Sequence, residues 1–153
     1  MDEIIGEFNL DGSTLDAALP LNWNIAPTNE IYIVRSESDS RILDSASWGI
    51  IAPWQKNLAD ARASQSHTIN ARSETLLEKA SFKHLIGRQH CVIPSTGFFE
   101  YQHVGKEKIP YFVHPAQDEL FSMAGIFDIY KNPLSGAVQK TFSIITCPTN
   151  ELM

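Results

Sequence analysis

Three short blocks of the sequence carry side chains that can act together chemically. They are Asn70-Ala71-Arg72, the segment from Gly97 to Glu100, and the segment from Trp48 to Trp54. An amide donates and accepts hydrogen bonds, a guanidinium binds phosphate through two parallel bonds, and a carboxylate carries a proton. Indole rings stack on unpaired bases. Together these groups are typical of a site on single-stranded nucleic acid with acid–base chemistry inside it.

Glu100 is the candidate for moving the proton. Alternate side chains of a strand share a face, so Phe98 lies with Glu100, and Phe99 lies with Tyr101 on the other side. Among aromatic rings, loss of water raises the pKa of a carboxyl group, which suits proton transfer near neutral pH. The alternative is a glutamate on an edge strand that points into solvent.

The other two blocks also have structural alternatives. Asn70 and Arg72 are two residues apart, so a strand would direct both to the same side. Asn70 could instead form a turn, and Arg72 could pair with a carboxylate. The indoles of Trp48 and Trp54 could both pack in the core rather than against a ligand.

The elements that must position these blocks are mostly strands. Alternating apolar residues between turn residues predict strands over 30–35, 41–48, 89–94, 97–102, 109–114, 121–130 and 141–146, with 89–94 and 97–102 paired as a hairpin, and a short extended segment over 66–72. Spacing and capping residues predict short helical segments over 2–8, from Ser13 or Thr14 to Leu19, within 55–65, from Ser73 to Lys79, over 81–86 and from Thr149 onward. The predicted fold class is α+β, mainly antiparallel β with a few short helices.

Composition predicts an ordinary soluble protein. The chain has 153 residues, of which 43% are hydrophobic and 20% charged, as expected for one globular domain. No apolar run approaches the roughly 20 residues of a membrane helix, and the acidic start is unlike a signal peptide. Cys91 and Cys147 are too few for a disulfide framework, and neither has a second Cys or His at zinc spacing. We expect a cytoplasmic protein with both cysteines buried, no metal, no cofactor and no membrane contact.

Charge is unevenly distributed along the chain. The net charge of −6 argues against a globally basic nucleic-acid binder. Between Pro53 and His90, however, six basic residues face three acidic ones, which gives a local net charge of +3. Such a segment can present a phosphate-binding surface on an acidic protein. For Lys79 and Lys83 we prefer the alternative that they are simply solvated.

The sequence resembles the SRAP family (SOS-response-associated peptidases, the abasic-site processing proteins). The resemblance lies in four ordered blocks that span most of the chain, namely residues 23–27 (WNIAP), 48–54 (WGIIAPW), 70–75 (NARSET) and 88–91 (RQHC) running into 97–101 (GFFEY). It implies one SRAP-like domain over 1–153 with a barrel-like core and a positively charged groove for single-stranded DNA. The implied partner is single-stranded DNA with abasic sites, whose ring-opened sugar exposes an aldehyde, in the DNA-damage (SOS) response. We expect the protein to act as a monomer.

The resemblance also implies roles for individual residues. Asn70 would orient the nucleophile and the sugar, and Glu100 would shuttle protons during Schiff-base formation and ring opening. Arg72 would hold phosphate while Trp54 wedges against bases. The implied DNA-binding set is completed by Asn24, Pro27, Trp48 and Arg88.

The sequence departs from the family pattern in two places. The family opens with Met-Cys-Gly-Arg, and the amine and thiol of that cysteine close a thiazolidine on the aldehyde, whereas this chain opens with Met1 to Ile4 and has no cysteine before Cys91. The family also carries a catalytic histidine in an Ile-His-x-Arg-Met-Pro block just after the segment that matches Thr146 to Met153. We therefore expect a chain truncated at both ends that binds DNA but does not crosslink to it.

Two other functions stay open from the sequence. One is a module that binds single-stranded DNA without covalent chemistry. The other is a cysteine-type peptidase or other hydrolase, as the family name suggests. Peptidase chemistry needs a thiol beside a base, and only His90 adjoins Cys91, from the opposite face of the predicted strand.

Overall fold

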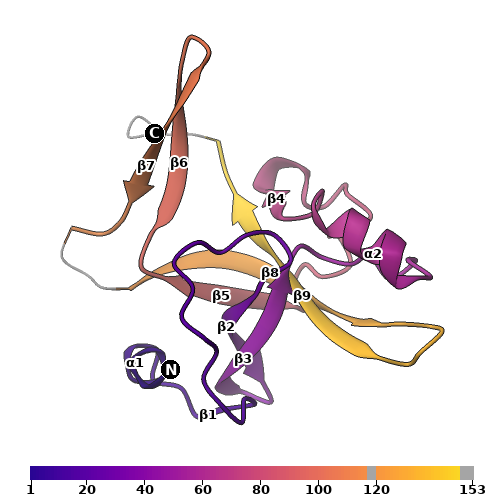
Figure 1. The fold of residues 1–153 in the computed structure, drawn as a ribbon. Coiled ribbons are helices and arrows are strands. Elements are labelled where there is room, and N and C mark those ends of the chain that lie inside the picture. Colours follow the sequence, from indigo (N-terminus) through magenta and orange to yellow (C-terminus); the bar gives the residue numbers. More distant parts are fainter. Residues whose placement is uncertain (117–119, 149–153) are drawn as a thin grey trace.

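A closed ring of five strands forms the centre of the computed structural model, which describes residues 1–116 and 120–148 (Figure 1). The ring consists of β2 (Glu30–Glu37), β3 (Ser40–Trp48), β5 (His90–Ser95), β8 (Phe121–Lys131) and β9 (Val138–Thr146). Antiparallel pairing joins β3 to β2, β2 to β5, β5 to β8 and β8 to β9, and β9 returns to β3 to close the barrel. The predicted class, α+β with mainly antiparallel strands and a barrel-like core, is confirmed.

Three parallel pairings complete the seven-stranded sheet. The closing seam between β3 and β9 is parallel and holds two residue pairs, Ser47 with Thr141 and Trp48 with Phe142. The short strand β1 (Gly12–Ser13) lies parallel to β3, and β4 (Asn70–Arg72) lies parallel to the end of β9. Both short strands therefore extend the barrel wall at its edges.

Alternation along the strands explains how the barrel is filled and covered. Ile33 of β2 points into the barrel with Phe142, Phe127 and Ile93, and all four are buried. The neighbouring Val34 points outward with Leu43, where α1 (Asp2–Glu7) covers them through Ile4. A further cluster on the outside of the barrel, built on Ile126, Ala71, Phe82 and Leu85, holds the turns that follow β4. Both faces of the central strands are thus buried.

Helix α2 (Leu58–Gln65) is fastened to the barrel by its last residue. Its cap is Asn57, whose side chain accepts a hydrogen bond from the backbone of Asp60. The buried Gln65 amide donates to the Ser47 hydroxyl and to the Gly49 carbonyl. Gly49 has a φ of +108°, and a Cβ there would collide with the Gln65 backbone. This close approach explains the glycine.

Three of the predicted helical segments do not form helices. Residues 81–86 are hydrogen-bonded turns, and the other two were predicted to begin at a hydroxyl residue. Ser13 lies in β1, and the Thr14 hydroxyl donates to Asp44 instead of capping a helix to Leu19. From Ser73 only a short 3-10 helix forms, η1 (Ser73–Thr75), in which the Ser73 hydroxyl donates to the Glu74 carboxylate. In both cases the hydroxyl group that was predicted to cap a helix donates a hydrogen bond to a carboxylate instead. The helix predicted from Thr149 lies outside the described residues.

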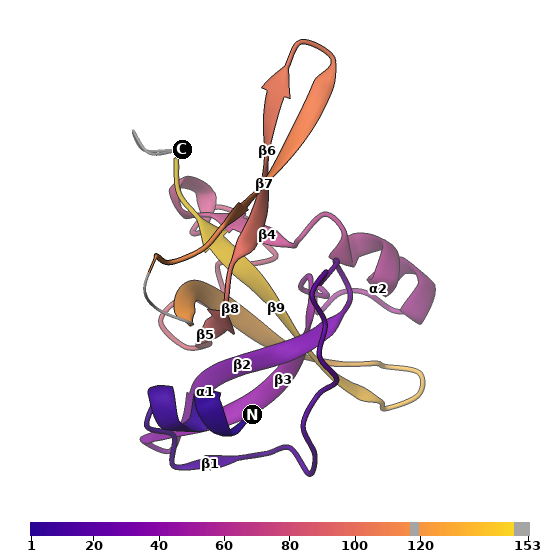
Figure 2. The ribbon, with the colours of Figure 1, turned by 60° about the vertical axis from the view of Figure 1, so that its left-hand side comes forward.

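The predicted hairpin between 89–94 and 97–102 is also wrong. β5 lies between β2 and β8, while β6 (Phe98–Val104) pairs with β7 (Glu107–Val113) in a separate two-stranded sheet. This hairpin projects away from the barrel in both ribbon views (Figures 1 and 2). The Ser95 hydroxyl bonds to the backbone of Gly97 and forms a turn between the two sheets. β5 buries Cys91 and Ile93 inside the barrel and half-buries Val92 on its other face, and it pairs with a strand on each side.

Candidate functional site

The Asn70-Ala71-Arg72 block forms β4, and its side chains alternate as predicted. Ala71 is fully buried, whereas Asn70 and Arg72 are exposed together on the other side. Parallel pairing sets Asn70 opposite Ile144 and Arg72 opposite Thr146 of β9. A strand of three residues is therefore held at the barrel edge and presents an exposed amide and an exposed guanidinium on one face.

The two indoles of the second block have different environments. Trp48 is half-buried, its ring lies nearly parallel to Phe142 with centroids 6.5 Å apart, and its N–H donates to the Ile69 carbonyl at 3.0 Å. Trp48 thus packs against the core and helps to hold the segment before β4, as its structural alternative proposed. Trp54 is 53% exposed and offers an open ring face.

Asn24 and Pro27 lie exposed in a loop that is bonded to the end of β3. The Asn29 side chain accepts from the Ala26 backbone, and the Asn24 backbone donates to the Asn22 side chain. Backbone bonds from Thr28 to Trp48 and from Trp48 to Asn29 fix this loop to the end of β3. The loop also presents Trp23, 82% exposed, which the sequence analysis placed in a motif but did not assign to the site. The sequence signal for this exposed ring was its position between Asn22 and Asn24, shortly before Pro27.

The predicted environment of Glu100, a carboxylate surrounded by aromatic rings, is wrong. Glu100 lies on β6 opposite Tyr111 and is exposed, so the aromatic burial that was expected to remove water is absent. The reason is that, within residues 1–116 and 120–148, the hairpin forms a two-stranded sheet that pairs with no third strand. Within residues 1–116 and 120–148, no hydrogen bond or ion pair joins Glu100 to Asn70 or Arg72.

Strand register nevertheless brings β4 and the hairpin to the same end of the barrel. Arg72 pairs with Thr146 at the end of β9, and Ser95 at the end of β5 pairs with Phe121. Because β8 and β9 are antiparallel, these two ends coincide, and Figure 1 shows β4 and the hairpin base on either side of the end of β9. Arg88 precedes β5 and lies at the other end of that strand, so it is not brought to Glu100.

The region around Arg72 is not purely cationic. Glu74 follows it in η1, and the pKa of the Glu74 carboxyl is lowered by hydrogen bonding to its own backbone, by the Ser73 hydroxyl and by the charge of Arg72. Glu74 therefore stays ionised next to the guanidinium. A phosphate at Arg72 has to compete with this carboxylate.

The cysteines are not arranged as nucleophiles. Cys91 is buried as predicted, and burial raises the pKa of its thiol to about 12. His90 is exposed and its Nε2 accepts a hydrogen bond from the Gly87 backbone. Cys147 is exposed, contrary to the prediction, because it follows the last residue of β9 and leaves the sheet. In the part of the chain that the structure describes, no group of three or more His, Cys, Asp or Glu side chains could hold a metal, and no helix is long and apolar enough to cross a membrane.

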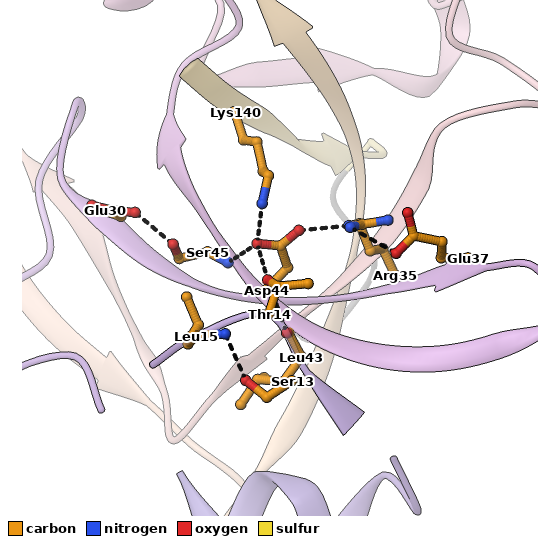
Figure 3. Close-up of polar contacts among 10 residues, drawn as sticks. All are labelled: Ser13, Thr14, Leu15, Glu30, Arg35, Glu37, Leu43, Asp44, Ser45 and Lys140. Atoms are coloured by element: carbon orange, nitrogen blue, oxygen red, sulfur yellow. Dashed lines mark hydrogen bonds and ion pairs between the residues drawn. The ribbon is translucent and has the colours of Figure 1, made fainter. Parts of the chain in front are cut away.

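A buried carboxylate that the sequence analysis missed lies at the β3–β9 seam (Figure 3). Asp44 is fully buried; its oxygens accept from Arg35 Nε at 2.6 Å and from Lys140 Nζ at 2.5 Å. The Thr14 hydroxyl and the Ser45 backbone donate to it at 2.7 and 2.8 Å. Burial alone would raise the pKa of Asp44, but bonds from Lys140, Arg35 and Thr14 hold it below its usual value. The sequence signal for this buried carboxylate was an aspartate in the middle of a predicted strand, directly after Ile42 and Leu43.

Beside this cluster the two strands of the seam separate and leave a pocket of about 530 Å³. Its polar lining residues include Glu30, Ser45, Ser47, Arg62, Gln139 and Lys140. Several of these groups already bind each other, since Lys140 binds Asp44, Ser45 donates to Glu30, and Gln139 donates to Ser47. Much of the polar lining of the pocket thus takes part in the bonds that hold the seam.

Comparison with known proteins identifies relatives over the whole length. Residues 1–153 match the family described as SOS response associated peptidase (SRAP). The chain is 34% identical to the abasic site processing protein YoqW of Bacillus subtilis over 153 residues, covering 99% of the chain and 66% of that relative. It is 36% identical to the abasic site processing protein HMCES of Gallus gallus over 135 residues, covering 76% of the chain and 40% of that relative. The chain thus spans just under two thirds of the first relative and less than half of the second.

Solved structures share the fold. A protein from Bacteroides thetaiotaomicron, 40% identical, superposes with a TM-score of 0.75 over 82% of the chain and 53% of that structure. A protein from Bordetella bronchiseptica, at 22% identity, has a TM-score of 0.80 over 98% of the chain and 69% of that structure. The second likeness concerns the fold alone.

Proposed function

The chain belongs to the SOS response associated peptidase (SRAP) family, and from this membership we propose that it binds single-stranded DNA at abasic sites. The observation that carries the proposal is the exposed pair of Asn70 and Arg72 on one face of β4. This pair is anchored by the buried Ala71 and by pairing with β9. Relatives that are 34 and 36% identical to this chain are named abasic site processing proteins, which supports DNA with abasic sites as the ligand.

Each proposed contact follows from the chemistry of its side chain. The Arg72 guanidinium holds a backbone phosphate through two parallel N–H groups. The Asn70 amide orients the ring-opened sugar, and the open face of Trp54 stacks on a neighbouring base. Glu100 is the proposed proton carrier, and it reaches the aldehyde only when the bound strand extends from β4 to the hairpin base.

We propose further that this 153-residue chain binds without a covalent crosslink. A thiazolidine forms when an amine adds to the aldehyde and expels water, and a thiol then adds to the imine carbon as its proton passes to nitrogen. Both groups must belong to one residue. The cysteines of this chain are Cys91 and Cys147, and the amine of each is part of a peptide bond.

Binding is tested with a fluorescently labelled single-stranded oligonucleotide that carries one abasic site. Anisotropy titration should show affinity that falls with salt, and Arg72→Ala should weaken binding and reduce the salt slope by about 0.7 for one lost phosphate contact. Lys79→Ala is the matched control, because Lys79 is exposed but is expected to be merely solvated. Absence of binding, or binding that does not depend on salt, would contradict the proposal.

The covalent step is tested separately with the same oligonucleotide on a denaturing gel after heating. We expect no retarded band from the 153-residue chain. A heat-stable crosslink would show that the chain retains the chemistry and would overturn the non-covalent proposal while leaving DNA binding intact. Light scattering on the same samples checks the proposed monomer.

A further inference from the structure

The pocket beside the β3–β9 seam is built on the outer face of the barrel. Directly paired residues of an antiparallel sheet share a face, and Gln139 is paired with Tyr130 while Ser47 is paired with Glu30. Phe142, which fills the barrel, lies an odd number of positions from Gln139, so Gln139 and Tyr130 point outward. A hydrogen bond from Gln139 to Ser47 places the second pair on the same side. Two pairs of strands thus contribute to one wall of the pocket.

The pocket lies at the opposite end of β9 from the strand β4. β4 pairs with residues 144–146 at the end of β9, whereas the pocket is lined by residues 137–140 at its start. Figure 1 shows β4 and the turn between β8 and β9 near opposite ends of β9. The pocket is therefore separate from the exposed side chains of Asn70 and Arg72.

Ser47, a buried residue of the pocket, keeps a hydrogen-bond donor unused. It is 7% exposed, and its oxygen accepts from Gln65 Nε2 at 2.7 Å and from Gln139 Nε2 at 3.1 Å. Both lone pairs are then occupied, and the hydroxyl hydrogen has no acceptor among the described residues. Turning the Gln139 amide over would only transfer the spare donor from Ser47 to Gln139. The wall of the pocket therefore offers a donor in either case.

Asn132 offers a second donor from the turn between β8 and β9. It is 3% exposed, and its Oδ1 accepts from the backbone of Leu134 and Ser135 at 2.9 and 3.0 Å, which fixes the oxygen end of the amide. Its Nδ2 donates to no described residue. In the described part of the chain, every polar side-chain atom that is sealed from solvent has a partner, so Nδ2 is reached by solvent, and Asn132 lines the pocket.

The charges of the pocket favour an anion. Arg62 of α2 and Lys140 line it together with one carboxylate, Glu30. Arg62 forms no ion pair with a described residue, and Lys140 binds Asp44 with one N–H and keeps its other donors (Figure 3). One oxygen of Glu30 accepts from Ser45, and the other has no partner among the described residues. Spare donors therefore outnumber spare acceptors, and the acceptors suit hydroxyl groups.

We propose that this pocket binds a small oxyanion that also carries hydroxyl groups, such as a sugar phosphate or a hydroxycarboxylate. The charged oxygens accept hydrogen bonds from Arg62, Lys140 and Asn132, and a hydroxyl group donates to Glu30. The volume of about 530 Å³ lies in the usual range of small-molecule sites, roughly 300–1,000 Å³. Donors on buried residues are reached more easily by a small molecule than by a nucleic-acid backbone. The inference does not rest on the proposed DNA binding.

The class of ligand is tested with three small probes. Isothermal titration calorimetry compares ribose 5-phosphate, malate and uncharged ribose. Ribose 5-phosphate or malate should bind with a Kd of about 1 mM or tighter, and ribose about tenfold more weakly because it lacks charged oxygens. The tighter of the two anions shows whether the oxyanion is a phosphate ester or a carboxylate. The inference is wrong if neither anion binds below about 10 mM, or if ribose binds as tightly as the anions.

Variants test whether the probe binds in the pocket. Arg62→Ala removes an exposed cation of the lining and should weaken binding about tenfold or more. Lys56→Ala is the matched control, because this exposed cation precedes α2 without lining the pocket, and screening should limit its effect to less than about twofold. Asn132→Asp keeps the oxygen that accepts from the turn but replaces Nδ2 by a carboxylate oxygen. It should weaken anion binding about tenfold or more at an unchanged melting temperature.

The outcomes separate this inference from the proposed function. Equal losses in Arg62→Ala and Lys56→Ala would assign binding to general positive charge and overturn the inference. Loss of probe binding in Arg72→Ala, with both pocket variants unchanged, would place the probe at β4 and also overturn it. If Arg62→Ala weakens binding of the abasic oligonucleotide as much as binding of the probe, the cation belongs to the nucleic-acid surface and the inference is wrong. Failure of the probes to bind leaves the proposed DNA binding intact.

Discussion

The barrel and the β6–β7 hairpin are both built from β-strands, yet they differ in what surrounds each strand. Every strand of the ring has two neighbours, and side chains such as Ile33 and Phe142 are fully buried. Each hairpin strand has one neighbour, and Phe99 and Phe112 remain half-exposed. Polar groups follow the same division, because Asp44 is buried with four partners while Glu100 is exposed without one among the described residues. Stability therefore resides in the barrel, and the hairpin is free to present chemistry.

The largest effect should come from removing the buried carboxylate of the barrel. Asp44→Ala leaves Arg35 and Lys140 without their shared partner at the seam, and the free energy of unfolding should fall by about 3–5 kcal/mol. Urea denaturation measures the change. Glu37→Ala removes the exposed partner of the same arginine and should cost no more than about 1 kcal/mol. Equal losses in the two variants would show that Asp44 does not hold the seam.

A methyl group placed inside the barrel should have the next largest effect. A Cβ at Gly125 would lie 3.0 Å from Cys91 Sγ and 3.0 Å from the Ser143 carbonyl oxygen, so Gly125→Ala should cost about 1–3 kcal/mol. Gly12→Ala is the control, since nothing lies within 4 Å of its Cβ position. Thermal unfolding of the two variants provides the measurement, and an unchanged Gly125→Ala melting temperature would mean that the interior is looser than its packing indicates.

Acid should weaken the barrel through Asp44. Its pKa is lower in the folded chain than in the unfolded chain, so its stabilisation is fully present above the unfolded value of about 3.9 and is lost as pH falls through the folded value. Each unit of lowering contributes about 1.4 kcal/mol. The free energy of unfolding should fall more steeply below about pH 4 in the parent chain than in Asp44→Asn. Parallel slopes in the two proteins would assign acid sensitivity to other carboxylates.

The smallest effect on stability is expected in the hairpin. Phe112→Leu should change the free energy of unfolding by about 0.5 kcal/mol or less, because this ring is half-exposed and its ring contacts among the described residues are those with Phe99 and His114. Hydrogen exchange offers the complementary test, since amides of β8 should exchange only by global unfolding and amides of β6 and β7 much faster. Equal protection in the two regions would remove the distinction between barrel and hairpin.

Local pattern predicted the parts of the fold that depend on neighbouring residues. Alternation in residues 30–35 and 41–48 predicted two strands that form as β2 and β3, and helical spacing predicted α1. The spacing of two between Asn70 and Arg72 predicted their common exposed face, because a strand alternates wherever it is placed. The ordered motifs predicted the family, which the comparisons confirm. The roles assigned to the site residues stay predictions.

Only the tertiary structure decided which strands meet and which side chains lose water. β5 and β6 are consecutive strands joined by a short turn, a pattern that predicts a hairpin. In the structure, however, β5 pairs within the barrel and β6 pairs with β7 outside it. Burial of Asp44 depends on Arg35 of the adjacent strand β2 and on Thr14 and Lys140, which lie 30 and 96 residues from it in sequence. Exposure of Glu100 follows from its place in a two-stranded sheet that, among the described residues, pairs with no further strand. Local residue types determine how the side chains of a strand alternate. Strand pairing and burial depend on residues distant in sequence, so closure of the barrel determines which face of a strand is buried.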